Sequence, residues 1–336
     1  MNRFFWRPLL ASALLGFSVT LHAQTPMFTD LPKDSPILPA VLYLQEKGIV
    51  QAAPLFNPNG KLTRAQAAKI IVAPLVSSEE LRKIVSSQFS DVPADQWYMP
   101  YAEAARSLGI VDSAPAFKPS ANVTKAAFIK MLLSSKKISA SSTYSEFMLP
   151  LSADIADAKA WFYPVMRYAL SASLTAVGQD GMLTPNKEIT RGEMALLTYR
   201  LAMYKEGRRT QALLSQTETE IANVLKMLDA KSIEQAEWAS ARSIITVRGA
   251  LASRPTEPLV KGAVKIAEGF QSLVKGYKAG VTGDLDLVLV LAKEAYAYGD
   301  KAIAFAPGLQ TIATQMQAIA KNMADQARET KASPAQ

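Results

Sequence analysis

The stretch that decides the fold is FSDVPADQWYMPYAEAARSLGIVDSAPAFKPSANVTKAAFIKML, residues 89–132. It aligns without a gap with FTDLPKDSPILPAVLYLQEKGIVQAAPLFNPNGKLTRAQAAKII, residues 28–71, at an offset of 61. The identical pairs include Phe28/Phe89, Asp30/Asp91, Gly48/Gly109, Phe56/Phe117 and Thr63/Thr124. Self-similarity at a fixed period is the signature of a repeat protein. We therefore predict a duplicated structural unit.

A third, more diverged copy occupies residues 151–201, LSADIADAKAWFYPVMRYALSASLTAVGQDGMLTPNKEITRGEMALLTYRL. Two residues are added around Gly178–Gly181, and Ser173 stands where the first two copies have Gly48 and Gly109. We therefore expect the third repeat to differ most in local geometry. Its matching positions are Asp154, Trp161, Pro164, Leu183, Pro185, Thr190 and Arg191.

Each copy predicts two helices joined by a loop. The first helix starts near a Pro, which favours the first helical turn, and the second starts after a Thr, which is a good N-cap. These residues are Pro39, Pro100, Pro164, Thr63, Thr124 and Thr190. Gln66 and Glu193 complete a capping box with the first and third Thr, whereas Ala127 in the second copy does not. One helix pair cannot bury its apolar face alone, so we expect the three units to pack together.

A basic residue follows each Thr, although the positive end of the helix dipole disfavours a cation there by about 0.3–1 kcal/mol. These residues are Arg64, Lys125 and Arg191. One explanation is structural: the base is solvated, or it pairs with an acid of a neighbouring repeat. The candidate acids are Asp30, Asp91 and Asp154. The other explanation is functional: free helix-start amides and the cation together bind a carboxylate or phosphate. In that case we expect Arg191 to be the best site, because its copy keeps the full Thr-Arg-x-Glu pattern.

The three copies resemble the S-layer homology (SLH) domain family. The resemblance rests on the Phe-x-Asp-hydrophobic start, the Trp/Tyr-Pro beginning of the first helix, its Gly-Ile end and the Phe-x-Pro loop. It also includes the Thr-Arg-Ala-Glu signature, present as Thr63-Arg64-Ala65-Gln66, Thr124-Lys125-Ala126-Ala127 and Thr190-Arg191-Gly192-Glu193. The resemblance implies an all-α fold, a pseudo-threefold helical spindle. It also implies anchoring of an exported protein to an anionic, often pyruvylated, cell-wall polysaccharide or to a peptidoglycan-linked polymer.

The resemblance and the residue types together give a set of candidate glycan-binding residues. Trp97 and Trp161 lie where the first helix begins, and their flat rings suit sugars as well as a core, so both roles stay open. The Asp residues either brace loops or accept sugar hydroxyls, while Phe56 and Phe117 are expected in the core. The candidates are Arg64, Lys125, Arg191, Thr63, Thr124, Thr190, Gln66, Glu193, Asp30, Asp91, Asp154, Trp97 and Trp161.

Residues 205–336 carry none of these motifs. Apolar residues recur at helical spacing, and breaks near 254–258, 280–283, Gly299 and 307–308 predict about five helices, the first able to continue the last helix of the third repeat. The pattern predicts a helical bundle or an array of helical hairpins. Such helices often form surfaces for an envelope protein partner or for self-association.

The first 23 residues predict a secretory signal peptide, with Arg3 and Arg7 before an apolar stretch and Ala23 at the cleavage position. The chain has no Cys, and its single His, His22, falls within this segment. Without these residues a mature protein has no Cys/His zinc site, no Ser-His-Asp triad and no Cys nucleophile. We therefore expect no catalytic residues, no metal site and no cofactor. No basic stripe points to nucleic acid, although the net charge is +8.

The sequence thus predicts a non-catalytic envelope protein, exported to the cell wall, an S-layer or the periplasmic face of the envelope. Two alternatives stay open: an anchored enzyme whose catalytic module is the C-terminal half, and a structural S-layer subunit. The predicted domains are a signal peptide at 1–23, repeats at 24–76, 77–133 (with a linker helix) and 134–204, a helical domain at 205–330 and a disordered tail at 331–336.

Overall fold

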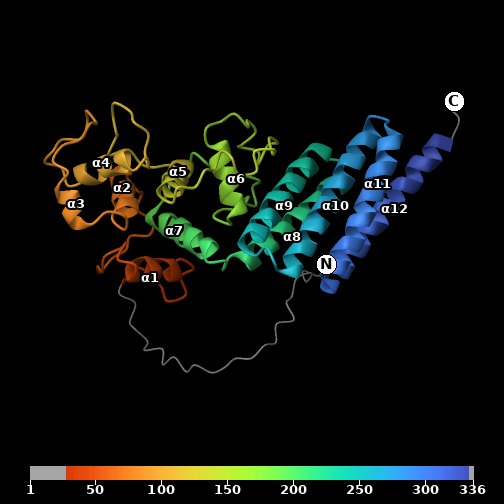
Figure 1. The fold of residues 1–336 in the computed structure, drawn as a ribbon, viewed down its shortest axis with the longest axis horizontal. Helices are drawn as coiled ribbons and strands as arrows, with labels where there is room; N and C mark the ends of the chain where they lie inside the picture. Colours follow the sequence, from red (N-terminus) through yellow and green to blue (C-terminus); the bar gives the residue numbers. More distant parts are fainter. Residues whose placement is uncertain (1–27, 333–336) are drawn as a thin grey trace, which may run out of the picture.

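The described part of the chain folds into helices, turns and loops. The computed structural model describes residues 28–332, so the predicted signal peptide lies outside the described range, as do residues 333–336. Within this range the β-type contacts are isolated bridges, and the predicted all-α fold is confirmed (Figure 1). The helices are α1 Leu38–Glu46, α2 Arg64–Val72, α3 Ser78–Arg82, α4 Met99–Ser107, α5 Lys125–Ser135, α6 Tyr163–Ser171, α7 Arg191–Lys205, α8 Thr210–Asp229, α9 Ile233–Ser253, α10 Pro258–Val281, α11 Leu285–Phe305 and α12 Gln310–Ala332, with a short 3-10 helix at Pro307–Leu309.

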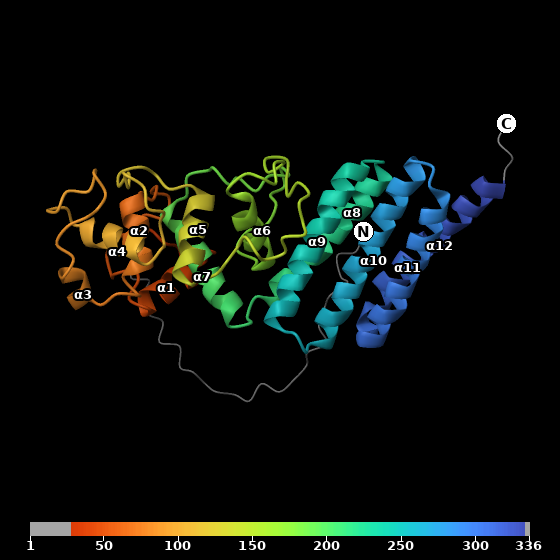
Figure 2. The same cartoon turned by 45° about the horizontal axis from the view of Figure 1, so that its top comes forward.

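Three helix pairs form a closed ring. The pairs α1–α2, α4–α5 and α6–α7 are the three repeats, and α3 links the first two. Helix α2 packs against α4, α5 against α6, and α7 returns to α1, so each repeat contacts both others. Figures 1 and 2 show the ring at one end of an elongated molecule and α8–α12 at the other. The predicted pseudo-threefold arrangement of helix pairs is therefore what the structure contains.

Short extended segments before the second helix of each repeat meet at the centre of the ring. The amide of Val123 donates to the carbonyl of Leu62 at 2.9 Å, that of Ile189 to Val123 at 3.0 Å, and that of Leu62 to Ile189 at 3.1 Å. All three side chains are buried. Because a buried backbone group without a partner is costly, the loss of any one repeat would leave a donor and an acceptor unsatisfied in the other two.

The second helices begin at the predicted capping residues. The hydroxyls of Thr63, Thr124 and Thr190 each accept a hydrogen bond from the third amide of the following helix. The side chains of Gln66 and Glu193 accept in return from the amide of the capping Thr. The two predicted capping boxes are present, and the second repeat has the Thr half alone.

The first helix of every repeat ends at a residue in the left-handed conformation. Gly48 and Gly109 have φ of +68°, and Ser173 has φ of +53°. The third repeat therefore has the same backbone conformation here as the other two, and the expected local difference is not found at this position. A residue with a Cβ is strained there by about 1–2 kcal/mol. Arg209 offsets that strain, because its Nη2 donates to the Ser173 carbonyl at 3.1 Å and to its Oγ at 2.7 Å.

Helices α8–α12 form an array of hairpins in which each helix packs against the next. The predicted number of helices is correct, and three of the predicted breaks, near 254–258, 280–283 and 307–308, fall between helices. The predicted break at Gly299 is wrong, and two observed breaks were not predicted. Helix α8 ends at a turn with Lys231 at φ +57°, and Gly207 at φ +70° separates α7 from α8. Gly299 lies inside α11, where an added Cβ would sit 2.7 Å from Gln317, so this glycine serves packing. Helix α12 continues through Ala332, two residues into the predicted tail. Within 28–332 no helix combines the length and apolarity needed to cross a membrane.

Helix α10 packs on the last helix through glycines spaced by seven residues. A Cβ at Gly269 would lie 2.4 Å from the sulfur of Met316, so a larger residue there would force this side chain to move. The glycines are Gly262, Gly269 and Gly276, and the side chains that fill the space above them are Leu309, Met316 and Met323. The matching seven-residue spacing on both sides fixes the register of α10 against α12.

The array is packed directly on the third repeat. A Cβ at Gly249 of α9 would lie only 1.7 Å from the carbonyl oxygen of Ser171 at the end of α6. Nearby, the buried guanidinium of Arg242 donates to both carboxylate oxygens of Glu220 at 2.8 and 2.7 Å and to the carbonyl of Leu151 at 3.0 Å. These contacts attach α8 and α9 to the third repeat at two points: Leu151, where the repeat begins, and Ser171, where α6 ends.

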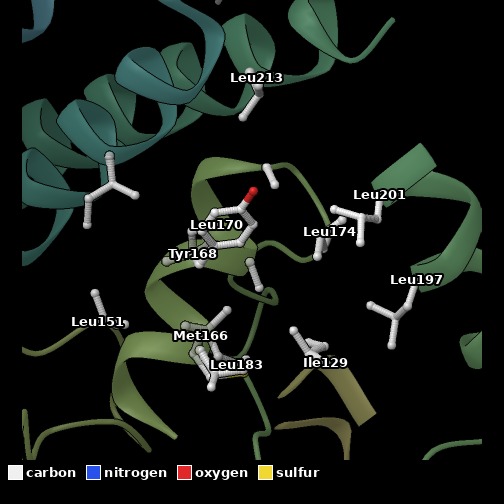
Figure 3. Close-up of a cluster of buried hydrophobic side chains, with 14 of the residues drawn as sticks. Ile129, Leu151, Met166, Tyr168, Leu170, Leu174, Leu183, Leu197, Leu201 and Leu213 are labelled. Carbon is white, nitrogen blue, oxygen red and sulfur yellow. The ribbon is translucent and has the colours of Figure 1, made fainter. Parts of the chain in front are cut away.

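The apolar core is continuous across this junction. Figure 3 shows Leu213 of α8 in the same cluster of buried apolar side chains as Leu170, Leu174 and Leu201 of the third repeat. A single cluster of buried apolar side chains includes residues of both the ring and the array. We therefore expect the ring and the array to unfold as one cooperative unit.

The junction gives a direct stability test. Gly249→Ala should lower the free energy of unfolding by about 1–3 kcal/mol, the usual cost of overpacking, although Ala favours a helix. Gly280→Ala is the matched control, because its added methyl meets only the Val288 side chain at 3.7 Å; it should be neutral or stabilising by up to about 1 kcal/mol. Urea denaturation of both variants measures the difference. Equal stability of the two variants would contradict the close approach at Ser171.

Candidate functional site

The basic residue of each second helix reaches across to the loop of the next repeat. Nε of Arg191 donates to the Phe56 carbonyl at 2.8 Å, and its guanidinium lies 5.0 Å from the centre of the Phe56 ring. Nζ of Lys125 donates to the Leu183 carbonyl at 2.8 Å. The three contacts join Arg64 to the Phe117 loop, Lys125 to the Leu183 loop and Arg191 to the Phe56 loop. Each base therefore connects its repeat to the following one, whereas each central amide donates to the preceding repeat.

The amides at the start of each second helix are not free. The amide of Arg64 donates to the carbonyl of Ala121 at 2.9 Å, and that of Ala65 to Pro119 at 3.0 Å. The equivalent amides of the other two repeats make the same bonds to the loops of their neighbours, and the third amide is held by the capping Thr. The prediction that free amides and the base together bind an anion is therefore wrong. In the second and third repeats, loop carbonyls that accept from the side chains of Lys125 and Arg191 offset the unfavourable cation–dipole arrangement.

The three bases differ in how many donors remain for a ligand. Nζ of Lys125 also donates to Thr184 Oγ1 at 2.6 Å, so two acceptors hold it. Arg191 uses Nε for the loop of the first repeat. Within residues 28–332 the guanidinium of Arg64 makes no hydrogen bond; it stacks on Phe117 at 5.1 Å. Burial lowers the pKa of each base, but an Arg stays charged. Arg64, rather than Arg191, thus keeps the most free donors.

The three Asp residues brace the loops of their own repeats. Asp91 accepts from the amides of Phe117 and Lys118, both at 2.7 Å, and Lys118 has φ of +60°. Asp30 and Asp154 make the equivalent pairs of bonds. Burial alone would raise the pKa of these carboxyls, but the amide hydrogen bonds outweigh it, and each pKa lies below its usual value. Both oxygens of each Asp are thus directed to the backbone that they hold in place.

Trp97 and Trp161 lie on the surface where neighbouring repeats meet. They are 52% and 53% exposed, so neither is a core residue. Nζ of Lys69 in α2 lies 5.6 Å from the centre of the Trp97 ring, and Nζ of Lys130 in α5 lies 6.0 Å from that of Trp161. We call these the first and second Trp–Lys pairs. Each combines a flat apolar face with a cation, and each is built from two repeats.

The third junction, between α7 and α1, has no such pair. Pro36 stands at the position of Trp97, and Leu196 at the position of Lys69. The rings of Tyr43 and Tyr199 meet there edge to face, with centroids 5.3 Å apart. The approximate symmetry of the ring therefore does not extend to its surface, and the two Trp–Lys pairs mark two of the three junctions.

The two lysines are residues that the sequence analysis missed. Lys69 and Lys130 occupy the same position in the first two copies, 61 residues apart. The gapless alignment could have singled them out, because each repeats a cation on the exposed face of its helix. The alignment could not identify the partner of each lysine, because that partner is a Trp of the following repeat.

The same three segments match a known family. A protein-family comparison finds the S-layer homology domain at residues 28–68, 88–129 and 153–195, which are the three helix pairs of the ring. The chain carries three S-layer homology domains. These domains and the relatives described next indicate an exported, cell-wall-associated protein of the cell surface.

Several curated proteins are similar to part of this chain. The surface-layer 125 kDa protein of Lysinibacillus sphaericus is 29% identical over 205 residues, 58% of this chain and 17% of that protein. The S-layer protein sap of Bacillus anthracis is 26% identical over 133 residues, 39% of this chain and 16% of that protein. An endoglucanase of Bacillus sp. (strain KSM-635) is 32% identical over 121 residues, 35% of this chain and 12% of that protein. The chain thus spans less than a fifth of the length of these relatives.

The loop-bracing carboxylates predict a pH-dependent stability. Asp91→Asn should lower the free energy of unfolding by about 1–2 kcal/mol near neutral pH, because charge-assisted hydrogen bonds to two amides are weakened. The folded-state pKa lies below the ordinary 3.8, so this stabilisation is present above that value and is lost as the pH falls through the lowered pKa. Urea denaturation across the acid range should show wild type and variant converging.

Asp95→Asn is the control, since this carboxylate is exposed and accepts from the side chain of Gln96. It should change stability little at any pH. A constant difference between Asp91→Asn and wild type down to the lowest pH would contradict the ionised brace.

Proposed function

We propose that the three S-layer homology domains anchor this protein non-covalently to an anionic cell-wall polymer, and that the two Trp–Lys pairs carry the recognition. The observation behind this proposal is a half-exposed indole beside a lysine at two inter-repeat junctions. An indole face suits the C–H face of a sugar ring. An ammonium group at the same place pairs with a carboxylate or phosphate carried by that sugar.

The polymer that fits this chemistry is a polysaccharide with an acidic substituent, such as a pyruvylated wall glycan, or a peptidoglycan-linked anionic polymer. Lys69 lies over the ring of Trp97 and is exposed. An incoming sugar would take the ring face while the long lysine side chain moves to the rim and keeps its charge near the acidic group. The flexible stem of Lys suits such a movement.

The two pairs should differ in strength. Lys130 of the second pair already forms an ion pair with Asp112 at 2.7 Å, so an anion must displace that carboxylate. In the first pair, Lys69 lies 5.9 Å from a second ring, that of Tyr101. We therefore expect the first pair to bind more tightly. Of the bases at the helix starts, Arg64 keeps free donors and adds positive charge, whereas Lys125 and Arg191 chiefly hold the ring together.

The helical array has a separate role in this proposal: it displays or assembles a partner at the wall. A structural S-layer subunit is a second candidate, and the names of the surface-layer relatives favour it. An enzymatic array is disfavoured, because residues 28–332 contain no Cys or His and no group of acids placed to hold a metal. The endoglucanase match covers 12% of that protein and carries no argument for catalysis here.

The test is co-sedimentation of the full chain with purified cell wall. Trp97→Ala should weaken binding about tenfold, because it removes an exposed stacking surface worth roughly 1–2 kcal/mol, and Trp161→Ala should weaken it less. The double variant should lose most binding while remaining folded. Phe305→Ala removes a comparably exposed ring (42%) from the array and should bind as wild type. Undiminished binding by the folded double variant would show that the Trp–Lys pairs are not the site.

A further inference from the structure

An open pocket of about 600 Å³ lies between α11 and α12, the two helices at the end of the array away from the ring (Figure 1). This volume falls within the roughly 300–1,000 Å³ typical of small-ligand sites. Leu289, Val290 and Tyr296 of α11 form one wall, and Ala320 and Ala324 of α12 form the other. The proposal below is independent of wall binding, because no residue of the ring lines this pocket.

Polar contacts between the two helices lie on either side of the pocket along the helix axes. At one end the ammonium of Lys331 pairs with Asp286. At the other, Nε2 of Gln317 donates to Asp300 at 2.7 Å and to the Tyr296 carbonyl at 3.1 Å. Asp286 and Asp300 are fourteen residues apart on α11, which corresponds to about 21 Å of helix. The pocket therefore lies along the two helices between these contacts.

The α11 wall of the pocket is apolar and exposed. Val290 is 62% and Tyr296 46% exposed, although both belong to well-formed helix. Across from them, Ala320 and Ala324 are one helical turn apart and leave a depression where larger side chains would fill the space. Exposed apolar surface of this kind gains free energy when it is covered.

The rim of the pocket is positively charged. Lys293, Lys321 and Arg328 line it, and within residues 28–332 neither lysine takes part in an ion pair, while Arg328 pairs with Asp325. The one acid in the lining, Asp300, accepts from the buried amide of Gln317. The charge that faces an occupant is therefore cationic, and an anionic group complements it.

We propose that this pocket binds a single lipid-type amphiphile, with a linear aliphatic chain along the apolar wall of α11 and an anionic headgroup at Lys293 and Lys321. A linear chain can lie along the apolar groove between these two flanking contacts. The cationic rim selects an anionic head over a neutral or cationic one.

The experiment is isothermal titration calorimetry of the full chain with dodecanoate below its micelle concentration. We expect saturable binding of one molecule per chain. Affinity should rise about threefold to fourfold for each methylene added between octanoate and dodecanoate, the usual gain for a buried CH₂. Dodecyltrimethylammonium, with the same chain and the opposite charge, should bind at least tenfold more weakly.

Variants locate the site. Ala324→Phe fills the depression and should abolish binding, whereas Ala318→Phe, on the exposed face of the same helix, should not change it. Lys293→Glu with Lys321→Glu should weaken dodecanoate binding at least tenfold, whereas Lys275→Glu on α10 should leave it unchanged. All four variants should still sediment with cell wall, which separates this proposal from the anchoring function.

Three results would overturn the proposal: no saturable binding, equal binding of the cationic amphiphile, or binding that Ala324→Phe leaves intact. Self-association of the chain that Ala324→Phe abolishes, seen by analytical ultracentrifugation, would also overturn it, because the pocket would then be an interface between copies.

Discussion

The ring of backbone hydrogen bonds between Leu62, Val123 and Ile189 is the constraint on which the rest of the structure depends. Each repeat gives an amide to one neighbour and a carbonyl to the other, at a buried point where water cannot replace a missing partner. The first two amides of each second helix donate to carbonyls in the loop of the following repeat. The basic side chain at the start of that helix contacts the same loop. A helix pair on its own would leave these groups unsatisfied, which is the physical reason why three pairs close on one another.

This constraint assigns two roles to residues that lie close together in the sequence. Residues whose side chains reach the loop of the following repeat, including Lys125 and Arg191, hold the ring closed and are partly desolvated. Residues on the outside of the junctions, such as Trp97 and Lys69, are exposed and free to bind. A surface built from two repeats exists only when the ring is closed, so the fold and the candidate binding surface depend on the same contacts. The third junction keeps the inner contacts and has lost the outer ones.

The sequence predicted what is local or repeated. The gapless alignment identified the repeats, and Thr63 and its counterparts identified the helix starts, because capping is decided within four residues. It did not predict where the helix-start amides go, since their acceptors lie in another repeat, about 60 to 130 residues away in the chain. Gly299 was read as a break because sequence alone does not separate a glycine that ends a helix from one that admits Gln317. The turn at Lys231 was missed because its left-handed residue is neither Gly nor Asn.

The central claim is that the three repeats and the packed array form one cooperative structure closed by the central amides. Native-state hydrogen exchange of the amides of Leu62, Val123 and Ile189 tests it most directly. The account predicts that all three exchange with the same free energy of opening, equal to that of global unfolding. An amide of one repeat that exchanges much faster than the other two would show that this repeat opens alone, and would contradict the closed ring.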